Sequence, residues 1–267
     1  MDEAAHSRLT GKVAIITGAA QGIGEATARL FKMRGIKGLM LTDRQEGKLK
    51  SVAESLGAQY VVADLADPAQ VVRIVPAADA AFGRVDILVN VAGLTDRGTI
   101  WNTDVALWDR MFAINVRAPF FLMQAAARVM KRGGQGGAVV NIASINAHGG
   151  ASFLTPYSAS KAALAVLTKN VAHSLLPERI RVNALNPGWV DTPGEDTTLR
   201  KFHDAKDDWR EVGGASRPFG RLISAEEVAR AIAFLASDES GLMTGTAIDY
   251  DQLVMGVNET IGPRTPG

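Results

Sequence analysis

Tyr157 and Lys161 are the residues whose types and spacing point most directly to chemistry. They stand four positions apart, and Ser144 lies thirteen positions before Tyr157. Residues four apart share one face of a helix, and Pro156 suits a first helical turn, so the two side chains are expected to meet. A neighbouring ammonium favours the phenolate and should lower the tyrosine pKa, which suits a residue that transfers a proton. A surface pair on an amphipathic helix is the alternative interpretation.

A glycine-rich turn near the start of the chain could hold a phosphate. Gly18, Gly22 and Gly24 follow an apolar run and precede a helical pattern over residues 25–31. Without side chains, the backbone can approach a pyrophosphate, whose charge is favoured by the free amides and the dipole at a helix start. The spacing differs from the common G-x-G-x-x-G pattern, so an ordinary strand-to-helix turn stays open.

Asp43 ends the next apolar run, about twenty residues beyond the glycine turn. A carboxylate there can accept hydrogen bonds from the adenosine ribose and would repel a ribose phosphate. Two unit charges near 4 Å apart interact by roughly 1 to 4 kcal/mol at effective dielectrics of 80 to 20. We therefore expect a preference for NAD over NADP. Arg44 complicates this, because a guanidinium can bind the phosphate or lie across the adenine.

Short apolar runs alternate with helical patterns along the chain, which predicts parallel strands with helical crossovers. Several runs lack period-two alternation, so both sheet faces should be covered by helices in a doubly wound, Rossmann-type α/β fold. We expect a single domain over residues 1–267. The predicted strands are residues 13–17, 39–42, 60–63, 87–90, 138–143, 181–185 and 246–250. One long helix, apolar nearly all round, is predicted over residues 104–131.

Polar or flexible residues follow three of these strands, where ligands bind in this architecture. Ser144 ends the strand 138–143, and the segments 90–93 and 186–192 follow two others. Each segment could also be an ordinary turn. Together with the glycine turn and Asp43, these residues resemble the short-chain dehydrogenase/reductase family over about residues 10–250. The resemblance also matches Asp64-Leu65 to the pair that the family places beside the adenine.

The resemblance implies a catalytic tetrad of Asn115, Ser144, Tyr157 and Lys161. Tyr157 would take the hydroxyl proton of the substrate, Ser144 would hold the carbinol oxygen, and Asn115 would support a water chain. Lys161 would bond the nicotinamide ribose. The cofactor site that it implies comprises Gly18, Gln21, Gly22, Ile23, Gly24, Asp43, Arg44, Asp64, Leu65, Asn90, Ala92, Gly93, Tyr157, Lys161, Pro187, Gly188, Val190 and Thr192.

The chain departs from the family pattern at two places. Val91 replaces a usual asparagine, and Asp251-Gln252-Leu253 replaces the usual Asp-Gly-Gly near the end. The second change puts the carboxyl-terminal turn and any subunit contact there in doubt. The resemblance favours a homotetramer through helices over about residues 104–131 and 156–176.

The expected substrate lid, residues 191–215, is heavily charged. Because it offers little apolar area for an acyl chain or steroid, we expect a sugar or polyol as the alcohol or carbonyl substrate. A solvated loop face is the alternative explanation of the charges. A 3-oxoacyl thioester substrate and a non-catalytic dinucleotide sensor also stay open. The candidate substrate contacts are Thr95, Arg97, Ser144, Asn146, His148 and Trp189.

Composition excludes several other classes. The net charge of +1 gives no support for nucleic-acid or anionic-membrane partners, and the chain has no cysteine. Its four histidines lack metal-ligand spacing, so no metal is expected. Residues 1–10 lack the apolar core of a signal peptide and no run is long enough to span a bilayer, so a cytoplasmic location is expected. Residues 259–267 are expected to form a polar tail.

Overall fold

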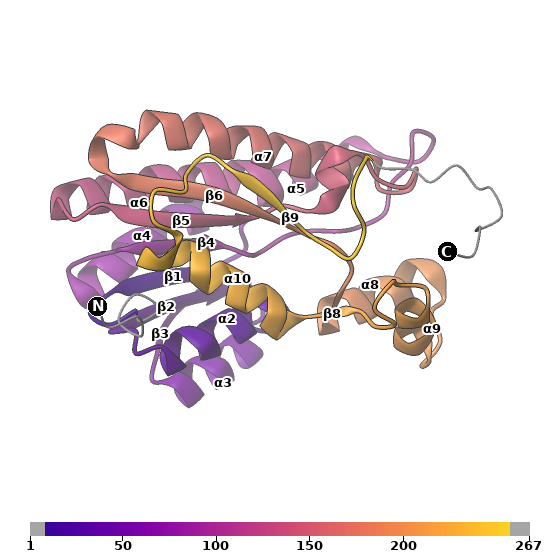
Figure 1. Cartoon of the computed structure of the whole chain (residues 1–267), viewed down its shortest axis with the longest axis horizontal. Coiled ribbons are helices and arrows are strands. Elements are labelled where there is room, and N and C mark those ends of the chain that lie inside the picture. The colour runs from indigo at the N-terminus through magenta and orange to yellow at the C-terminus, as the bar shows by residue number, and fades with distance from the viewer. Residues whose placement is uncertain (1–8, 257–267) are drawn as a thin grey trace, which may run out of the picture.

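The computed structural model describes residues 9–256, which build a seven-stranded parallel sheet (Figure 1). The strand order is β3-β2-β1-β4-β5-β6-β9. The strands are β1 (Val13–Thr17), β2 (Gly38–Asp43), β3 (Gln59–Val62), β4 (Ile87–Asn90), β5 (Gly137–Ile142), β6 (Ile180–Pro187) and β9 (Ala247–Tyr250). Each overlaps a strand predicted from the sequence. The expected tail over residues 259–267 lies outside the described residues.

Helices cover both faces of the sheet, as Figure 1 shows. On one face α2 (Gly22–Met33), α3 (Glu46–Leu56) and α10 (Ala225–Ala236) enclose one apolar cluster. On the other, α4 (Pro68–Phe82), α6 (Ala118–Gly133) and α7 (Thr155–Ser174) enclose a second. β1 and β4 are buried along their whole length because apolar side chains point to both layers. The predicted doubly wound fold is confirmed.

The order of strands reverses between β1 and β4, and the connections of these strands run to opposite faces. Such a switch point leaves a crevice at the carboxyl ends of the strands. The Thr17 hydroxyl, at the end of β1, accepts hydrogen bonds from the Val91 and Ala92 amides, both at 3.0 Å. The loop after β4 is therefore fixed beside the glycine turn.

The long helix predicted over residues 104–131 contains a π-helical turn. It divides into α5 (Val105–Phe112), the π turn η1 (Ala113–Arg117) and α6. A π turn adds a residue to one helical turn and is common at functional sites. Phe121 on α6 is 45% exposed and Trp108 on α5 is 41% exposed, so the helix is not deeply buried within this chain.

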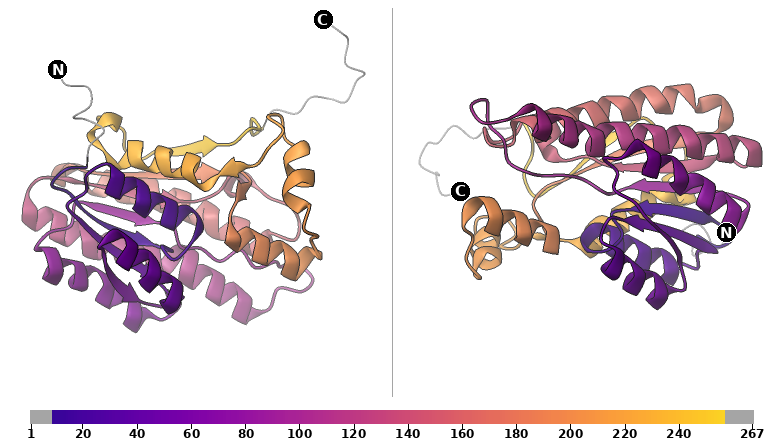
Figure 2. Two further views of the ribbon diagram at one scale, coloured as in Figure 1. Left: turned by 90° about the horizontal axis from the view of Figure 1, so that it is seen from below. Right: turned by 180° about the vertical axis from the view of Figure 1, so that it is seen from behind.

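A smaller unit projects beyond the carboxyl ends of the strands (Figure 2). It comprises α8 (Pro193–His203), α9 (Trp209–Ala215) and the short parallel pair β7 (Val190–Asp191) and β8 (Ile223–Ser224), which the sequence did not predict. Three further short turns are η2 (Ile145–His148), η3 (Leu176–Glu178) and η4 (Asp238–Ser240). Within residues 9–256, no helix has the length and apolarity to cross a membrane.

Candidate active site

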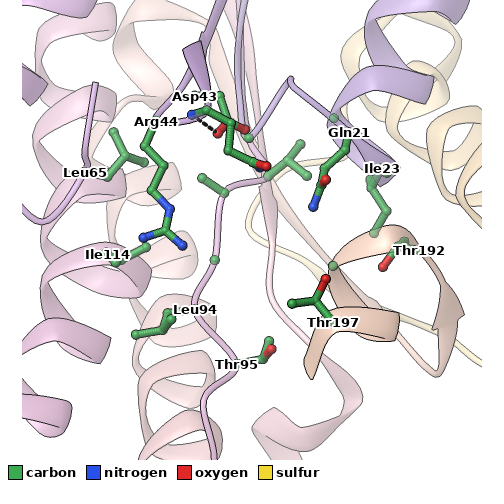
Figure 3. A pocket seen from close by; sticks show the side chains of 18 of the residues that line it. Gln21, Ile23, Asp43, Arg44, Leu65, Leu94, Thr95, Ile114, Thr192 and Thr197 are labelled. Atoms are coloured by element: carbon green, nitrogen blue, oxygen red, sulfur yellow. Dashed lines mark hydrogen bonds between the residues drawn. The ribbon is translucent and has the colours of Figure 1, made fainter. Parts of the chain in front are cut away.

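A cavity of about 480 Å³ lies at the switch point of the sheet. The glycine turn, the ends of β2 and β3, the loop after β4 and the start of α8 form its walls (Figure 3). The predicted cofactor residues that line it are Gly18, Gln21, Gly22, Ile23, Gly24, Asp43, Arg44, Asp64, Leu65, Ala92, Gly93 and Thr192.

The glycine turn is closed on its inner side and has free amides at the helix start. A side chain at Gly24 would overlap the Gly18 carbonyl, and a Cβ at Gly18 would lie 2.9 Å from the Ala92 nitrogen. Only glycine allows these approaches. Gln21 precedes α2 without capping it through its side chain, so the first amides of α2 keep their capacity to bind an anion. The turn therefore fits a dinucleotide diphosphate.

Asp43 lies at the end of β2, beside the glycine turn. Its carboxylate accepts hydrogen bonds from the Ala20 amide at 3.2 Å and the Gln45 amide at 3.0 Å. These bonds hold an anionic group at the cavity wall. Arg44 extends into the cavity beside Leu65 and Ile114, as Figure 3 shows.

Asp64 lines the cavity after β3. Burial acts to raise its pKa, but bonds from the Ala66 amide at 2.9 Å and Arg110 at 3.1 Å outweigh burial, so the pKa is lowered. The carboxylate is therefore ionised and held in one orientation.

Six predicted cofactor residues do not line the cavity: Asn90, Tyr157, Lys161, Pro187, Gly188 and Val190. Asn90 is buried and donates to the Asn141 side chain at 2.8 Å, so it lies beneath the crevice. Gly188 is covered by Asp251, with which any Cβ at position 188 would collide. Pro187 ends β6 and Val190 begins β7, so both belong to the segment that leads into α8.

Tyr157 and Lys161 lie one turn apart near the start of α7, as predicted. Both are buried, at 9% and 3% exposure, and the Lys161 Nζ lies 5.7 Å from the centre of the Tyr157 ring. Lys161 Nζ donates to the Ile142 carbonyl at 2.7 Å. The Ser144 hydroxyl lies close enough to Tyr157 to act on its pKa, and it accepts from the Asn146 amide at 3.1 Å. The ends of β5 and α7 thus bring these three side chains together.

Burial dominates the protonation of this pair. It raises the pKa of Tyr157 to about 12, against the opposing bond from Ser144 and the opposing charge of Arg97. The prediction that this pKa is lowered is therefore wrong for the protein without a bound cofactor, because the loss of solvent around Tyr157 outweighs the effect of neighbouring groups. Burial also lowers the pKa of Lys161 to about 8. The lysine can gain or lose a proton close to neutral pH.

Asn115 lies in the π turn and is fully buried. Its side chain accepts from the Leu94 amide at 2.8 Å and donates to the Leu94 carbonyl at 2.9 Å. It also donates to the Ser160 hydroxyl at 2.9 Å. The amide of this side chain therefore fixes the loop after β4 against α7.

Gly93 connects the cavity to the catalytic candidates. It lines the cavity, and a Cβ at this position would lie 3.3 Å from Lys161 Nζ and 3.5 Å from Asn115 Oδ1. The cavity and the buried lysine therefore meet at one backbone position.

The predicted substrate contacts separate into two groups. Thr95 lines the cavity, and Arg97 follows it in the same loop, bonded through Nη1 to the Thr95 carbonyl at 2.7 Å. Asn146 bonds to Ser144, whereas His148 is held by Asp249 at 2.8 Å and is half exposed. Trp189 stacks on Trp209 with ring centres 6.0 Å apart.

Glu195, in the segment expected to form the lid, lines the cavity although its position in the sequence predicted no role for it. It accepts from the Trp189 indole at 3.1 Å and lies 3.7 Å from Arg97 Nη2. Burial raises the pKa of Glu195, opposed by Arg97 and by the Trp189 bond. Many charged residues surround Glu195 in the sequence, and their spacing does not distinguish its carboxylate from those of its solvated neighbours.

A family model described as enoyl-(acyl carrier protein) reductase matches residues 18–252. The chain is 38% identical over 254 residues to a (-)-isopiperitenol/(-)-carveol dehydrogenase of Mentha piperita, covering 93% of this chain and 95% of that protein. It is 36% identical over 249 residues to a sorbitol dehydrogenase of Cereibacter sphaeroides, covering 91% and 97%. A solved short-chain type dehydrogenase/reductase from Mycobacterium marinum superposes with a TM-score of 0.83 at 30% identity, over 92% of this chain and 96% of that one. With its glycine turn, its buried Tyr157 and Lys161 and these similarities, the chain belongs to the short-chain dehydrogenase/reductase family of oxidoreductases.

Proposed function

We propose that this protein is an NAD-dependent dehydrogenase that oxidises a secondary or anomeric hydroxyl of a sugar or polyol, or reduces the matching carbonyl. The observation that carries the proposal is the meeting of the cavity with Lys161 at Gly93, one helical turn from Tyr157. A site for a dinucleotide thereby adjoins a side chain able to exchange a proton.

Tyr157, Ser144, Lys161 and Asn115 have distinct roles in this proposal. With a pKa of about 12 in the protein alone, Tyr157 is a neutral phenol near pH 7, so the positive charge of a bound oxidised nicotinamide ring would have to lower that pKa. As phenolate, Tyr157 would take the hydroxyl proton, and Ser144 would hold the same oxygen through its hydroxyl. When bound, the nicotinamide ring supplies the carbon that accepts hydride. Lys161 binds the ribose next to that ring and supplies positive charge, because a pKa lowered only to about 8 keeps most of its ammonium protonated at neutral pH. Asn115 keeps the loop after β4 in place and, in this proposal, supports a water chain beside it.

The preference for NAD over NADP is supported by Asp43. Its two backbone bonds hold the carboxylate at the wall of the cavity, where a ribose phosphate would meet a negative charge. Arg44 and Lys48 also line this wall and would attract the same phosphate. Lys48 is already bonded to Gln21 at 2.8 Å, whereas Arg44 lies beside apolar residues, where it can cover an adenine face.

A polyol substrate is supported by polar groups beside the proposed proton acceptor and by one relative. Arg97 and Glu195 lie close enough to Tyr157 for both charges to act on its pKa. The sorbitol dehydrogenase named above acts on a polyol. Residues 191–215, which include α8 and α9, are proposed as the substrate lid of a single dehydrogenase domain.

NAD-linked oxidation of sorbitol, galactitol and common aldoses, measured as NADH absorbance, tests the function. The same preparation is assayed for reduction of a 3-oxoacyl thioester with NADH and NADPH. We expect NADH formation with at least one polyol or aldose and none with a Tyr157→Phe control. Thioester reduction without polyol oxidation would favour the acyl substrate instead, and no turnover in either panel would favour a dinucleotide sensor. The homotetramer and the cytoplasmic location stay predictions.

A further inference from the structure

A polar cluster joins the loop after β4 to the lid helix α8 beside Tyr157. Arg97 is its centre: Nε donates to His203 at 3.0 Å, Nη2 lies 3.7 Å from Glu195, and the guanidinium lies 5.6 Å from the Phe153 ring. The side chains of Arg97 and Glu195 are only 12% and 20% exposed. Removing two charges this far from water costs folding free energy. We take that cost as a sign that the two charges are kept for a function.

Backbone hydrogen bonds and electrostatic interactions both connect the cluster to the region of Tyr157. Gly98, which follows Arg97, donates to the Phe153 carbonyl at 2.9 Å and accepts from the Thr155 amide at 3.2 Å. Leu94, in the same loop, packs against the apolar cluster that contains Tyr157. Glu195 acts to raise the pKa of Tyr157 and Arg97 acts to lower it. The cluster therefore lies near Tyr157, and Glu195 joins it to the cavity.

Both charged groups retain hydrogen-bonding capacity. The 3.7 Å between Arg97 Nη2 and Glu195 Oε1 is an ion pair and exceeds hydrogen-bond length. Among the described residues, neither Arg97 Nη2 nor Glu195 Oε2 makes a side-chain hydrogen bond. A donor and an acceptor thus stand side by side, each able to take one further partner.

A hydroxyl group fits this pair better than other substituents, because it donates one hydrogen bond and accepts another. A carboxylate would meet the Glu195 charge, and an ammonium would meet Arg97. A methylene would leave Arg97 Nη2 and Glu195 Oε2 without a further hydrogen-bond partner. We propose that Arg97 and Glu195 recognise a second hydroxyl on the carbon next to the one oxidised, so that the substrate is a vicinal diol. The inference rests on the proposed function and specifies its substrate class.

The test compares cis-1,2-cyclohexanediol with cyclohexanol, which differ only in the neighbouring hydroxyl. A hydrogen bond to a charged group alters kcat/KM by about 10- to 100-fold, so the enzyme should prefer the diol by roughly this factor. Glu195→Gln and Arg97→Met should each remove most of that preference by lowering kcat/KM for the diol. The readout is the ratio of kcat/KM for the diol to kcat/KM for cyclohexanol, because any change in the pKa of Tyr157 affects both substrates alike and cancels in the ratio.

Arg200→Met is the matched control. Arg200 pairs with Asp196 and Asp207 on the lid and does not line the cavity. It should keep the preference for the diol, whereas equal loss in this variant would indicate a general effect of lid charges and overturn the inference. Thermal unfolding checks each variant, and Glu195→Gln, which keeps side-chain shape, decides the matter if Arg97→Met does not fold.

The two levels of the proposal fail differently. If the unmodified enzyme oxidises the diol and both variants keep the same preference over cyclohexanol, the assignment of Arg97 and Glu195 is wrong while the proposed function stands. If the unmodified enzyme forms no NADH from the diol or from any polyol or aldose of the panel, the proposed function is wrong and the inference falls with it.

Discussion

The Asn115 side chain binds both polar atoms of the Leu94 backbone, accepting from its amide at 2.8 Å and donating to its carbonyl at 2.9 Å. One side-chain amide thus satisfies both backbone groups of Leu94, as a neighbouring strand would in a sheet. It fixes the loop that continues to Thr95 and Arg97, so that a buried amide in the π turn determines where the cavity wall stands.

Asn115→Asp should therefore be disruptive although it changes one atom. A carboxyl group cannot donate to both the Leu94 carbonyl and Ser160 as the amide does, and a buried unpaired polar group costs about 1 to 3 kcal/mol. Urea unfolding should show a loss of this size, and kcat/KM should fall with it. Ser160→Ala, which removes one of these partners, should cost less; an equal cost would contradict a dominant role for the Leu94 pairing.

Tyr157→Phe should retain the cofactor and lose turnover. The ring packing against Leu94 and Leu154 is kept, while the only group proposed to accept the proton is removed. General acid–base catalysis contributes about 10²- to 10⁴-fold, so kcat should fall at least that far. The dissociation constant for NADH, measured by fluorescence titration, should change less than about twofold. Substantial remaining turnover would refute the role of Tyr157.

Asp43→Ala should shift the cofactor preference toward NADP. Removing a charge within about 4 Å of a ribose phosphate relieves roughly 1 to 4 kcal/mol of repulsion, or several-fold to several hundred-fold in affinity. The ratio of kcat/KM values for NADP and NAD measures the shift. Arg44→Ala is the companion variant: it should lower the use of both cofactors if Arg44 covers the adenine, and of NADP alone if it binds the phosphate.

Glu195→Gln and Arg97→Met should move the acidic limb of the pH profile for alcohol oxidation, where activity is lost as Tyr157 gains a proton, in opposite directions. Glu195 acts to raise the pKa of Tyr157, so its neutral replacement should lower the kinetic pKa of alcohol oxidation. Arg97 acts to lower the same pKa, so its removal should raise it. The measurement is kcat/KM against pH. Arg200→Met should leave the profile unchanged, and shifts of the same sign in the two test variants would contradict this electrostatic account.

Glu227 should stabilise α10 in a pH-dependent way. It accepts from the Ser224 amide at 2.9 Å and from both Arg221 nitrogens at 2.7 Å, and the Arg221 bonds are the largest cause lowering its pKa to about 2. Because the folded pKa lies below the usual 4.5, the stabilisation is present above about pH 4.5 and is lost as pH falls toward 2.

Glu227→Gln should cost up to about 1 kcal/mol at pH 7, the usual upper worth of an exposed ion pair, because glutamine can keep the bond to the Ser224 amide but not the charge toward Arg221. Urea unfolding at decreasing pH should show the difference from the unmodified protein shrink below about pH 4.5. Glu226→Gln, an exposed acid in the same helical turn, serves as the control. A difference that does not depend on pH would contradict the proposed ion pair.

The strands and the turn that precedes α7 could be predicted because they depend on local patterns. Val13–Thr17 is apolar on both faces, and Pro156 sits in the first turn of the helix that aligns Tyr157 with Lys161. The raised pKa of Tyr157 could not be predicted, because it depends on how much solvent the assembled fold removes.

The π turn and the polar cluster at Arg97 depend on contacts between distant segments. Residues 104–131 have a continuous helical pattern, and the extra residue at Asn115 is favoured only once Leu94 is in place to bind it. Glu195 likewise becomes distinct from other lid acids only when α8 places it opposite Arg97. Sequence spacing carries no signal for either pairing.

Gly18 and Ala92 touch so closely that the turn for the diphosphate and the loop facing the alcohol make a single wall. A compound that displaces the glycine turn should also displace Thr95 and Arg97, because the loop that carries them is held against that turn. It would do so without contacting Tyr157. Inhibitors that bind where the nucleotide is proposed to bind should therefore also weaken binding of the alcohol.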